Sequence, residues 1–396
     1  MSRAAEVWPI VERMASNAAT DAIDLLVYPE VAYPSYWFES AERYRQDDIE
    51  RTAAVLTRFS RLAANHRIWI VAGYVEESGD DLYNSAAVFD RSGNLIGSAR
   101  KQFMWDCDRI WFTPGEQSSV FETEWGPMGV LICADMRMPE ISATLAARGA
   151  GFIVQPTAWV NARAFQGTHR NIQPDFLVRS RAMEFGLPFA CCSKSGRDGD
   201  VMEYVGQSRI VSAAGALLGS AAIGGDELVA AELTPGESPP IGHAPALNAR
   251  LLSEAPPFES DTAPPACRLL LRRGASHLLD DLRRMGARVE SMALSDLSRF
   301  GPARALALDG VQVIVAAGPL TEEVHARARA AENRIYLIVA DEESASLVIE
   351  PTGLIVWRRL DRLDTLDLDL AQADRKMFTP TTEIWGQRRP SSYQFK

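Results

Sequence analysis

The pattern of hydrophobic and polar positions divides the first 233 residues into short helices and strands. Residues 5–22 repeat apolar side chains at the spacing of an amphipathic helix, and residues 51–66 and 139–148 are predicted to be helical as well. Apolar runs bounded by turn or polar residues predict strands at 24–30, 68–76, 85–90, 128–133, 151–155, 188–193 and 208–212. This alternation of helices and strands favours an α/β layered fold.

The composition changes after residue 233. Residues 234–266 hold eight of the 22 prolines, separated by Ser, Gly and Ala, and no apolar period continues through them. Such a segment is typical of a linker or a long surface connection. Residues 267–396 return to helical and strand patterns. The sequence therefore predicts a main domain at 1–233, a linker at 234–266 and a smaller α/β half-domain at 267–396.

The last part is similar in sequence to the first. The stretch that begins at Cys133 aligns without gaps with the stretch that begins at Leu294, and residues 179–185 align with residues 327–333. We therefore expect the half-domain to be a degenerate copy without the chemistry described below, because leucine stands where Cys133 is. The alternative is a separate ligand-sensing domain whose alanine-rich sequence matches by chance.

The charge balance argues against two classes of partner. Fifty-two acidic residues against 41 Lys and Arg give a formal net charge of −11, and an acidic surface repels phosphate backbones and anionic lipid headgroups. We therefore expect neither nucleic acid nor a membrane as a partner. No run approaches about 18 consecutive apolar residues, and the N-terminal segment carries acids and arginines throughout, unlike a signal peptide.

The cysteines indicate a reducing compartment. Their five positions (107, 133, 191, 192 and 267) make an odd number and show no metal-site spacing. A disulfide framework or a structural zinc site is therefore not expected, and we predict reduced thiols and a cytoplasmic location. Because no glycine-rich phosphate loop occurs, we expect no nucleotide cofactor, and nothing in the sequence calls for another cofactor or a metal.

Three reactive side chains follow predicted strands. Glu30 ends the run Leu-Leu-Val-Tyr-Pro-Glu, Lys101 follows the strand after the turn at 91–97, and Cys133 ends Gly-Val-Leu-Ile-Cys. Ligands gather at the carboxyl ends of strands in open α/β sheets, so the three side chains can converge on one site. A thiol nucleophile, a carboxylate that accepts its proton and a cation that holds an oxyanion suffice for acyl transfer. Taken singly, each residue has a simpler explanation: Cys133 as a thiol of the core, Glu30 as a helix cap and Lys101 as a surface charge.

The contexts of these residues resemble the nitrilase superfamily of carbon–nitrogen hydrolases. Residues 25–30, 100–116 and 129–140 carry the resemblance, together with shorter matches such as Tyr83-Asn84-Ser85, and it extends over roughly residues 20–232. Three separate motifs in register make the match specific. The fold that the resemblance implies is a four-layer αββα sandwich.

The resemblance also assigns roles to single residues. It implies that Glu30 is the general base, Lys101 the stabiliser of the oxyanion and Cys133 the nucleophile. A second acid assists this triad in the family, and Asp108 stands at its position, where glutamate is usual. The alternative for Asp108 is a surface acid paired with Arg109.

Several positions depart from the family's pattern. The family begins with a strand before the first helix, whereas this chain opens directly in the helix at 5–22; residues 267–273 are our candidate for the missing edge strand. Gln102 follows Lys101 where histidine is familiar, and Phe185 replaces an asparagine. We therefore expect an unusual acyl pocket. The residues predicted to line it are Tyr36, Trp37, Ala134, Trp159 and His169.

The sequence predicts an amidase-like enzyme. We expect it to hydrolyse a primary amide or an N-carbamoyl compound through a thioester on Cys133, releasing ammonia or an amine. Asp135 resembles the amidase and carbamoylase branches, whereas nitrilases more often have Cys-Trp-Glu at these positions. A nitrile hydrolase on the same triad and a non-catalytic scaffold of the same fold stay open as alternatives. Since family members pair through their sandwiches, we also expect the half-domain to pack on the catalytic domain, with a homo-oligomer left open.

Overall fold

The computed structural model separates the chain into two compact units. Unit 1 comprises Met1–Ile241 and Ser392–Lys396, and unit 2 comprises Gly242–Ser391. The structure describes residues 4–161, 171–199, 201–239, 244–254, 267–271, 273–318, 320, 322–359, 365–379 and 381–395. In this described part, no helix is long and apolar enough to cross a membrane.

Unit 1 alternates helices and strands along the chain. Its helices are α1 (Ala4–Thr20), α2 (Ala41–Gln46), α3 (Thr52–His66), α4 (Asp108–Trp111), α5 (Pro139–Ala147) and α6 (Val178–Phe185), with a 3₁₀ turn η1 (Cys133–Arg137) and a π-helical turn η3 (Gln173–Leu177). Its strands are β1 (Leu25–Val27), β2 (Trp69–Ser78), β3 (Asp81–Phe89), β4 (Leu95–Arg100), β5 (Ser119–Thr123), β6 (Gly126–Val130), β7 (Phe152–Thr157), β8 (Phe189–Ser193), β9 (Ser195–Asp198), β10 (Met202–Val205), β11 (Arg209–Val211) and β12 (Leu217–Ser220). The helices and strands predicted from the hydrophobic pattern are present here.

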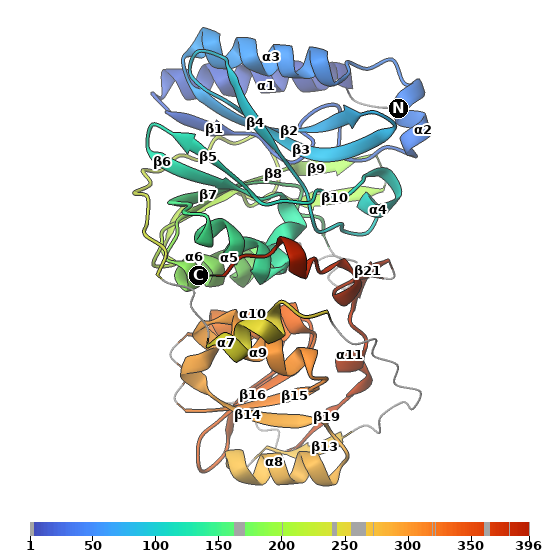
Figure 1. Ribbon diagram of the computed structural model, residues 1–396, viewed down its shortest axis with the longest axis vertical. Coiled ribbons are helices and arrows are strands. Elements are labelled where there is room, and N and C mark those ends of the chain that lie inside the picture. Colours follow the sequence, from blue (N-terminus) through green and yellow to red (C-terminus); the bar gives the residue numbers. More distant parts are fainter. Residues whose placement is uncertain are drawn as a thin grey trace. The chain divides into compact units, whose positions relative to one another are not determined.

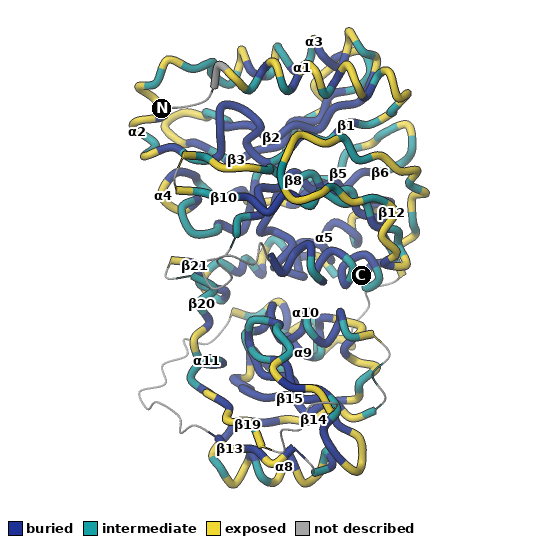
Figure 2. The backbone as a smooth tube through the Cα atoms, turned by 180° about the vertical axis from the view of Figure 1, so that it is seen from behind, coloured by how far each residue is buried: buried dark blue, intermediate teal, exposed yellow. Residues whose placement is uncertain are grey.

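Two sheets of unit 1 lie face to face between two layers of helices. One sheet has the strand order β1-β2-β3-β4 and is covered by α1 and α3; the other has the order β12-β11-β8-β7-β6-β5 and is covered by α5 and α6 (Figure 1). The strands between the helical layers are mostly buried (Figure 2). This arrangement confirms the predicted four-layer αββα sandwich.

The amphipathic pattern of the first helix explains its place on the sheet. Trp8, Val11, Ala15 and Ala18 lie on one face of α1 and are buried against α3 and the first sheet. A helix with such an apolar stripe gains most of its stability from this packing rather than from intrinsic helix propensity. The helical layer formed by α1 and α3 thus holds β1 in place, and with it the turn that carries Glu30.

Unit 2 is a smaller α/β unit. Its helices are α7 (Pro245–Leu251), α8 (Ala275–Arg284), α9 (Phe300–Leu308), α10 (Glu323–Asn333) and α11 (Ala371–Asp374), with 3₁₀ turns η4 (Leu294–Ser298) and η5 (Trp385–Gln387). Its strands are β13 (Cys267–Leu270), β14 (Val289–Ala293), β15 (Val313–Ala317), β16 (Tyr336–Ala340), β17 (Ala345–Ile349), β18 (Ile355–Arg358), β19 (Thr365–Leu368), β20 (Met377–Thr379) and β21 (Thr382–Glu383). The main sheet has the order β14-β15-β16-β17-β18.

The main sheet of unit 2 has the same connectivity as the larger sheet of unit 1. In both, two parallel pairs are followed by two antiparallel pairs: β6-β7-β8-β11-β12 in unit 1 and β14-β15-β16-β17-β18 in unit 2. Local contacts match as well. Arg181 pairs with Glu184 and donates to Met136 O, while Arg329 pairs with Glu332 and donates to Leu297 O.

One expectation about the region after residue 233 was wrong. Residues 267–273 do not supply an edge strand to unit 1, because Cys267–Leu270 pairs antiparallel with β19 inside unit 2. The predicted linker contains the helix α7, which begins with Pro245 at its first turn and is anchored by the fully buried Leu251. Proline at that position is compatible with a helix because its missing N–H needs no intrahelical partner.

The chain returns to unit 1 near its C-terminus. The N–H of Gln394 donates a hydrogen bond of 3.0 Å to Thr144 Oγ1 on α5. Tyr393 beside it is buried. Unit 1 is therefore built from two separate stretches of the chain.

Candidate active site

The candidate residues come from both sheets of unit 1. Glu30 lies in the turn after β1, and its N–H donates to Thr157 O at the end of β7, at 3.4 Å. Lys101 directly follows β4, and Cys133 begins η1, shortly after β6. All three side chains are buried, with Cys133 6% exposed and Glu30 and Lys101 at 0%. The strand ends of the two layers therefore meet at one enclosed site.

The Lys101 ammonium joins two carboxylates. Its Nζ donates to Glu30 Oε1 at 2.6 Å and to Asp108 Oδ2 at 2.5 Å. Asp108 is fully buried and also accepts a hydrogen bond from the Tyr36 hydroxyl at 2.9 Å, so it is not a surface acid. Buried charges are tolerated when they are paired and hydrogen-bonded in this way. Lys101 is thus fixed in position by both acids.

One oxygen of Glu30 is left for chemistry. Asn84 Nδ2 donates to Glu30 Oε1 at 2.7 Å, so this oxygen is shared by Asn84 and Lys101. The other oxygen, Oε2, is buried and has no hydrogen-bond partner among the described residues. A buried carboxylate oxygen without a hydrogen-bond partner destabilises the folded protein, and such groups are found where a protein transfers a proton or binds a substrate.

Cys133 sits on a strained turn. Its φ is +45°, in the left-handed region that residues other than glycine rarely adopt. Gln155 Nε2 donates to the Cys133 carbonyl at 2.7 Å and holds this conformation. Strain of this kind persists only when the surroundings enforce it, and it clusters at functional sites. The thiol faces Ala158 O at 3.9 Å, and Ala134, the residue after the thiol, is buried beside it.

Asp135 ties the Lys101 segment to the Cys133 turn. One oxygen of its buried carboxylate accepts hydrogen bonds from the N–H groups of Gln102 at 3.0 Å and Phe103 at 2.7 Å. The other oxygen accepts from the N–H of Ile132 at 3.0 Å. The two residues after Lys101 and the residue before Cys133 are therefore held by one side chain.

Burial and the local charges shift the pKa values of the site. Burial and the charge of Glu30 raise the pKa of Cys133 to about 12, while Lys101 acts in the opposite direction. Burial also raises the pKa of Glu30, against the lowering effect of Lys101. For Lys101, burial alone lowers the pKa, but the charges of Asp108 and Glu30 outweigh it and raise the pKa above its usual value. The resting site thus holds a neutral thiol beside a permanently charged lysine.

Of the residues predicted to line the pocket, the structure brings Tyr36 next to the centre. The Lys101 ammonium lies 5.9 Å from the centroid of the Tyr36 ring, and the Trp37 ring contacts that of Trp111 at 5.1 Å. Trp159 follows Ala158 and is fully buried, with an indole N–H that has no hydrogen-bond partner among the described residues. The fifth predicted residue, His169, lies outside the described residues.

Two residues that touch the centre were not predicted as part of it. Asn84 belongs to a motif that carried the resemblance, and that motif was the usable signal. Asp135 was noted only as a mark of the amidase branch, and its three backbone partners come from segments far apart in the sequence. Within the described residues, no group of three or more His, Cys, Asp or Glu side chains can hold a metal ion.

Comparison with known proteins identifies the family of this chain. A family model described as carbon-nitrogen hydrolase matches residues 2–238. The human omega-amidase is 31% identical over 218 residues, which cover 52% of this chain and 75% of that protein. An omega-amidase of Saccharomyces cerevisiae is 30% identical over 224 residues, covering 53% of this chain and 75% of that protein.

Solved structures show the same fold. A carbon-nitrogen hydrolase from Helicobacter pylori superposes with a TM-score of 0.53 at 24% identity, covering 58% of this chain and 84% of that one. The match includes the sandwich that the resemblance implied. On the family model and the relatives together, the chain belongs to the carbon–nitrogen hydrolase family.

Proposed function

We propose that this enzyme hydrolyses a primary amide or an N-carbamoyl compound through a thioester on Cys133. The observation that carries the proposal is the buried Lys101 bridge between Glu30 and Asp108, set beside a thiol on a strained turn. The omega-amidase relatives support an amide as the substrate. The constellation needs no metal or organic cofactor for this reaction.

In the first half-reaction the Cys133 sulfur attacks the substrate carbonyl carbon. Because the thiol pKa is about 12, its proton leaves during attack rather than beforehand, and Glu30 Oε2 is the acceptor. The Lys101 ammonium and the N–H of Ala134 hold the negative charge on the carbonyl oxygen. Collapse of this intermediate breaks the C–N bond, and Glu30 returns the proton to the leaving nitrogen. Ammonia or an amine departs and a thioester stays on Cys133.

In the second half-reaction water attacks the thioester carbon. Glu30 takes one proton from the water, and the same two donors, Lys101 and the Ala134 N–H, hold the new oxyanion. Breaking the C–S bond releases the acid, and the thiol recovers its proton from Glu30. Asp108 and Tyr36 do not touch the reacting atoms in this scheme; they keep the ammonium of Lys101 in place.

The proposal is tested by ammonia release from a matched panel of amides, N-carbamoyl compounds and nitriles. We expect turnover of at least one amide or N-carbamoyl compound, with a Cys133 acyl adduct visible by mass spectrometry after rapid acid quench. Turnover of nitriles alone would favour the nitrile hydrolase alternative. Turnover of an amide without any adduct on Cys133 would contradict the thioester.

We further propose that unit 2 is a non-catalytic copy of half of the catalytic sandwich. Leu294 begins η4 as Cys133 begins η1, so the position of the nucleophile is occupied by an aliphatic side chain. The shared strand order and the paired Arg–Glu contacts described above support a common origin of the two units. In this view unit 2 serves as an internal partner of the catalytic unit.

Replacing Asp135 by asparagine is expected to lower kcat about 10- to 100-fold with little change in KM. An amide offers one acceptor oxygen instead of two. Either the N–H groups of Gln102 and Phe103 or the N–H of Ile132 therefore lose their hydrogen-bond acceptor, and leaving such buried donors unsatisfied costs about 1–3 kcal/mol of free energy. The Cys133 turn and Lys101 then lose their common support. Initial rates over a range of substrate concentrations separate kcat from KM.

The chain offers a matched control at the equivalent place in unit 2. Asp296 lies in η4 as Asp135 lies in η1. Asp296→Asn is therefore the same chemical change in the same kind of turn, but in unit 2, and is expected to leave kcat unchanged. Equal losses in the two variants would show a general effect on folding instead of support of the site.

A further inference from the structure

Thr157 is the last residue of β7, and its backbone already touches the active site. Its carbonyl oxygen accepts hydrogen bonds from the N–H groups of Glu30, at 3.4 Å, and Lys194, at 3.1 Å. Its side chain is fully buried and takes no part in the reaction steps described above. What this hydroxyl group can do therefore depends on the atoms around it.

The strand β7 turns two polar side chains toward Cys133. Alternate residues of a strand share a face, so Gln155 and Thr157 point to the same side of the sheet. Gln155 Nε2 donates to the Cys133 carbonyl at 2.7 Å, which shows that this side faces the Cys133 turn. One residue after Thr157, the oxygen of Ala158 lies 3.9 Å from Cys133 Sγ. Thr157 thus lies between a contact with the Cys133 backbone and a contact with its sulfur.

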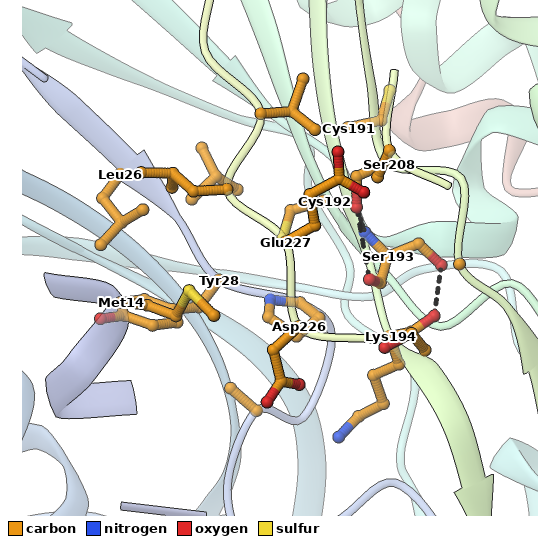
Figure 3. Close-up of a pocket in the computed structure, with 18 of the residues that line it drawn as sticks. Met14, Leu26, Tyr28, Cys191, Cys192, Ser193, Lys194, Ser208, Asp226 and Glu227 are labelled. Carbon is orange, nitrogen blue, oxygen red and sulfur yellow. Dashed lines mark hydrogen bonds between the residues drawn. The ribbon is translucent and has the colours of Figure 1, made fainter. Parts of the chain in front are cut away.

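The Thr157 hydroxyl has no partner in the resting structure. Its Oγ1 is buried and forms no hydrogen bond with a described residue. Ser193, its neighbour in register on β8, has a hydroxyl that is already engaged: it accepts from the N–H of Trp159 at 3.2 Å and donates to Lys194 O at 3.2 Å (Figure 3). A buried hydroxyl without a partner destabilises the folded protein, so this group calls for a functional explanation.

The sulfur of Cys133 is an acceptor for this hydroxyl in its charged form. Burial and the charge of Glu30 raise the pKa of the Cys133 thiol, whereas the Thr157 hydroxyl lowers it by donating toward the sulfur. A neutral thiol is a weak hydrogen-bond acceptor, and hydrogen bonds to a charged group are roughly twice as strong as those between neutral groups. The hydroxyl therefore gains a good partner only when the sulfur is negative.

We propose that Thr157 is a further catalytic residue, whose hydroxyl donates a hydrogen bond to the Cys133 sulfur whenever that sulfur carries negative charge. The inference rests on the proposed thioester reaction and adds a donor to it. In the first half-reaction the sulfur gains charge as its proton passes to Glu30. In the second the C–S bond breaks, and its electron pair stays on the sulfur until Glu30 returns the proton. A donor that finds its partner only at these points stabilises the transition states more than the resting enzyme.

The test measures how fast iodoacetamide alkylates Cys133 in the full chain. In this reaction the sulfur loses its proton and displaces iodide, so that a C–S bond forms as the C–I bond breaks. Thr157→Val removes the hydroxyl and keeps the shape of the side chain. Losing one hydrogen bond to the charged sulfur lowers the fraction of thiolate, and the higher nucleophilicity of the remaining thiolate offsets part of the loss, so we expect alkylation about three- to tenfold slower. Peptide mass spectrometry after timed quenching measures each cysteine separately.

The chain offers controls for the hydroxyl, the substitution and the reagent. Thr157→Ser keeps the hydroxyl and is expected to keep most of the wild-type rate. Thr57→Val makes the same change at an exposed position of α3 and is expected to have no effect. The half-buried Cys107 should be alkylated at one rate in all variants.

Folding of the variants is checked by thermal unfolding. Thr157→Val is expected to be no less stable than the wild type, because the hydroxyl that it removes has no partner in the resting structure. Thr157→Ala removes the same hydroxyl without adding bulk, so the rate of alkylation can still be compared if valine disturbs folding.

The outcomes decide whether the hydroxyl acts on the sulfur. Slower alkylation of Cys133 without the hydroxyl, together with a Thr157→Ser rate close to that of the wild type, supports the proposal. Equal rates with and without the hydroxyl would overturn it. A Thr157→Ser protein as slow as Thr157→Val would also overturn it, since the shape of the side chain would then be what matters. No amide is turned over in these measurements, so a failure here is distinct from a failure of the proposed hydrolysis.

Discussion

Replacing Cys133 by alanine is expected to lower amide hydrolysis by a factor of roughly 10⁴ or more, as loss of a covalent nucleophile does in other hydrolases. The expectation follows from the place of the thiol, on a strained turn beside the Lys101 bridge. Without sulfur no thioester forms, and the remaining groups can only orient the substrate. Ammonia release at saturating substrate measures the loss.

A second cysteine provides the control for this variant. Cys191 is also buried, but it lies within β8 rather than at the centre. Cys191→Ala is expected to keep most of the activity while changing the same kind of side chain. If Cys133→Ala kept more than a small fraction of the wild-type rate, another residue would have to be the nucleophile. The Cys133→Ala protein should still unfold in a single transition near the wild-type temperature.

Replacing Lys101 by methionine is expected to affect both catalysis and stability. The oxyanion loses its cation, so kcat/KM should fall by a factor of about 10²–10³. Glu30 and Asp108 are left as buried carboxylates without the ammonium between them, at a cost of about 3–5 kcal/mol in the free energy of unfolding at neutral pH. Urea unfolding of the variant and the wild type measures this difference.

The stability loss of Lys101→Met should depend on pH in a defined direction. Burial raises the pKa of Glu30 even in the wild type, and without the charge of Lys101 that pKa rises further. A carboxyl whose folded-state pKa exceeds its unfolded value binds a proton more tightly in the folded protein, so its contribution to stability is lost as the pH rises through the folded-state value. The deficit should therefore shrink as the pH falls from 8 toward 5.

The double variant Glu30→Gln with Lys101→Met separates the loss of stability from the loss of activity. Neutralising Glu30 as well removes one of the unpaired charges, so part of the stability should return while activity stays absent. A single variant Lys101→Met that is as stable as the wild type at pH 8 would contradict the geometry of the bridge. A deficit that grew as the pH fell would contradict the assigned sign of the Glu30 shift.

Much of the fold could be predicted from the sequence because its signals are local. The stripe of apolar residues in α1 is periodic because one face of the helix is buried, and the apolar runs of β2 and β7 are continuous because both faces of these strands are buried. The strand with which a given strand pairs is not encoded by such a local pattern. The pattern of Cys267–Leu270 correctly indicates a half-buried strand, but pairing with β19 rather than β1 is decided by tertiary packing.

The candidate site shows the same division between local and distant signals. Glu30, Lys101 and Cys133 stand out because reactive side chains interrupt apolar runs at strand ends. The role of Asn84 depends on β3 lying beside β2, which brings an amide of one strand to the carboxylate of another element. Likewise the bridge from Asp108 to Lys101 depends on the full burial of both side chains, which no local pattern in the sequence indicates.

The division of unit 1 into two stretches of chain has a practical consequence. Because Ser392–Lys396 groups with Met1–Ile241, unit 2 is an insertion with both ends attached to unit 1, not an appended tail. A single cut near residue 241 therefore cannot release an intact catalytic fragment, since it also removes the segment in which Gln394 bonds to Thr144. Excising unit 2 while keeping both stretches of unit 1 means joining residue 241 directly to residue 392 in the sequence.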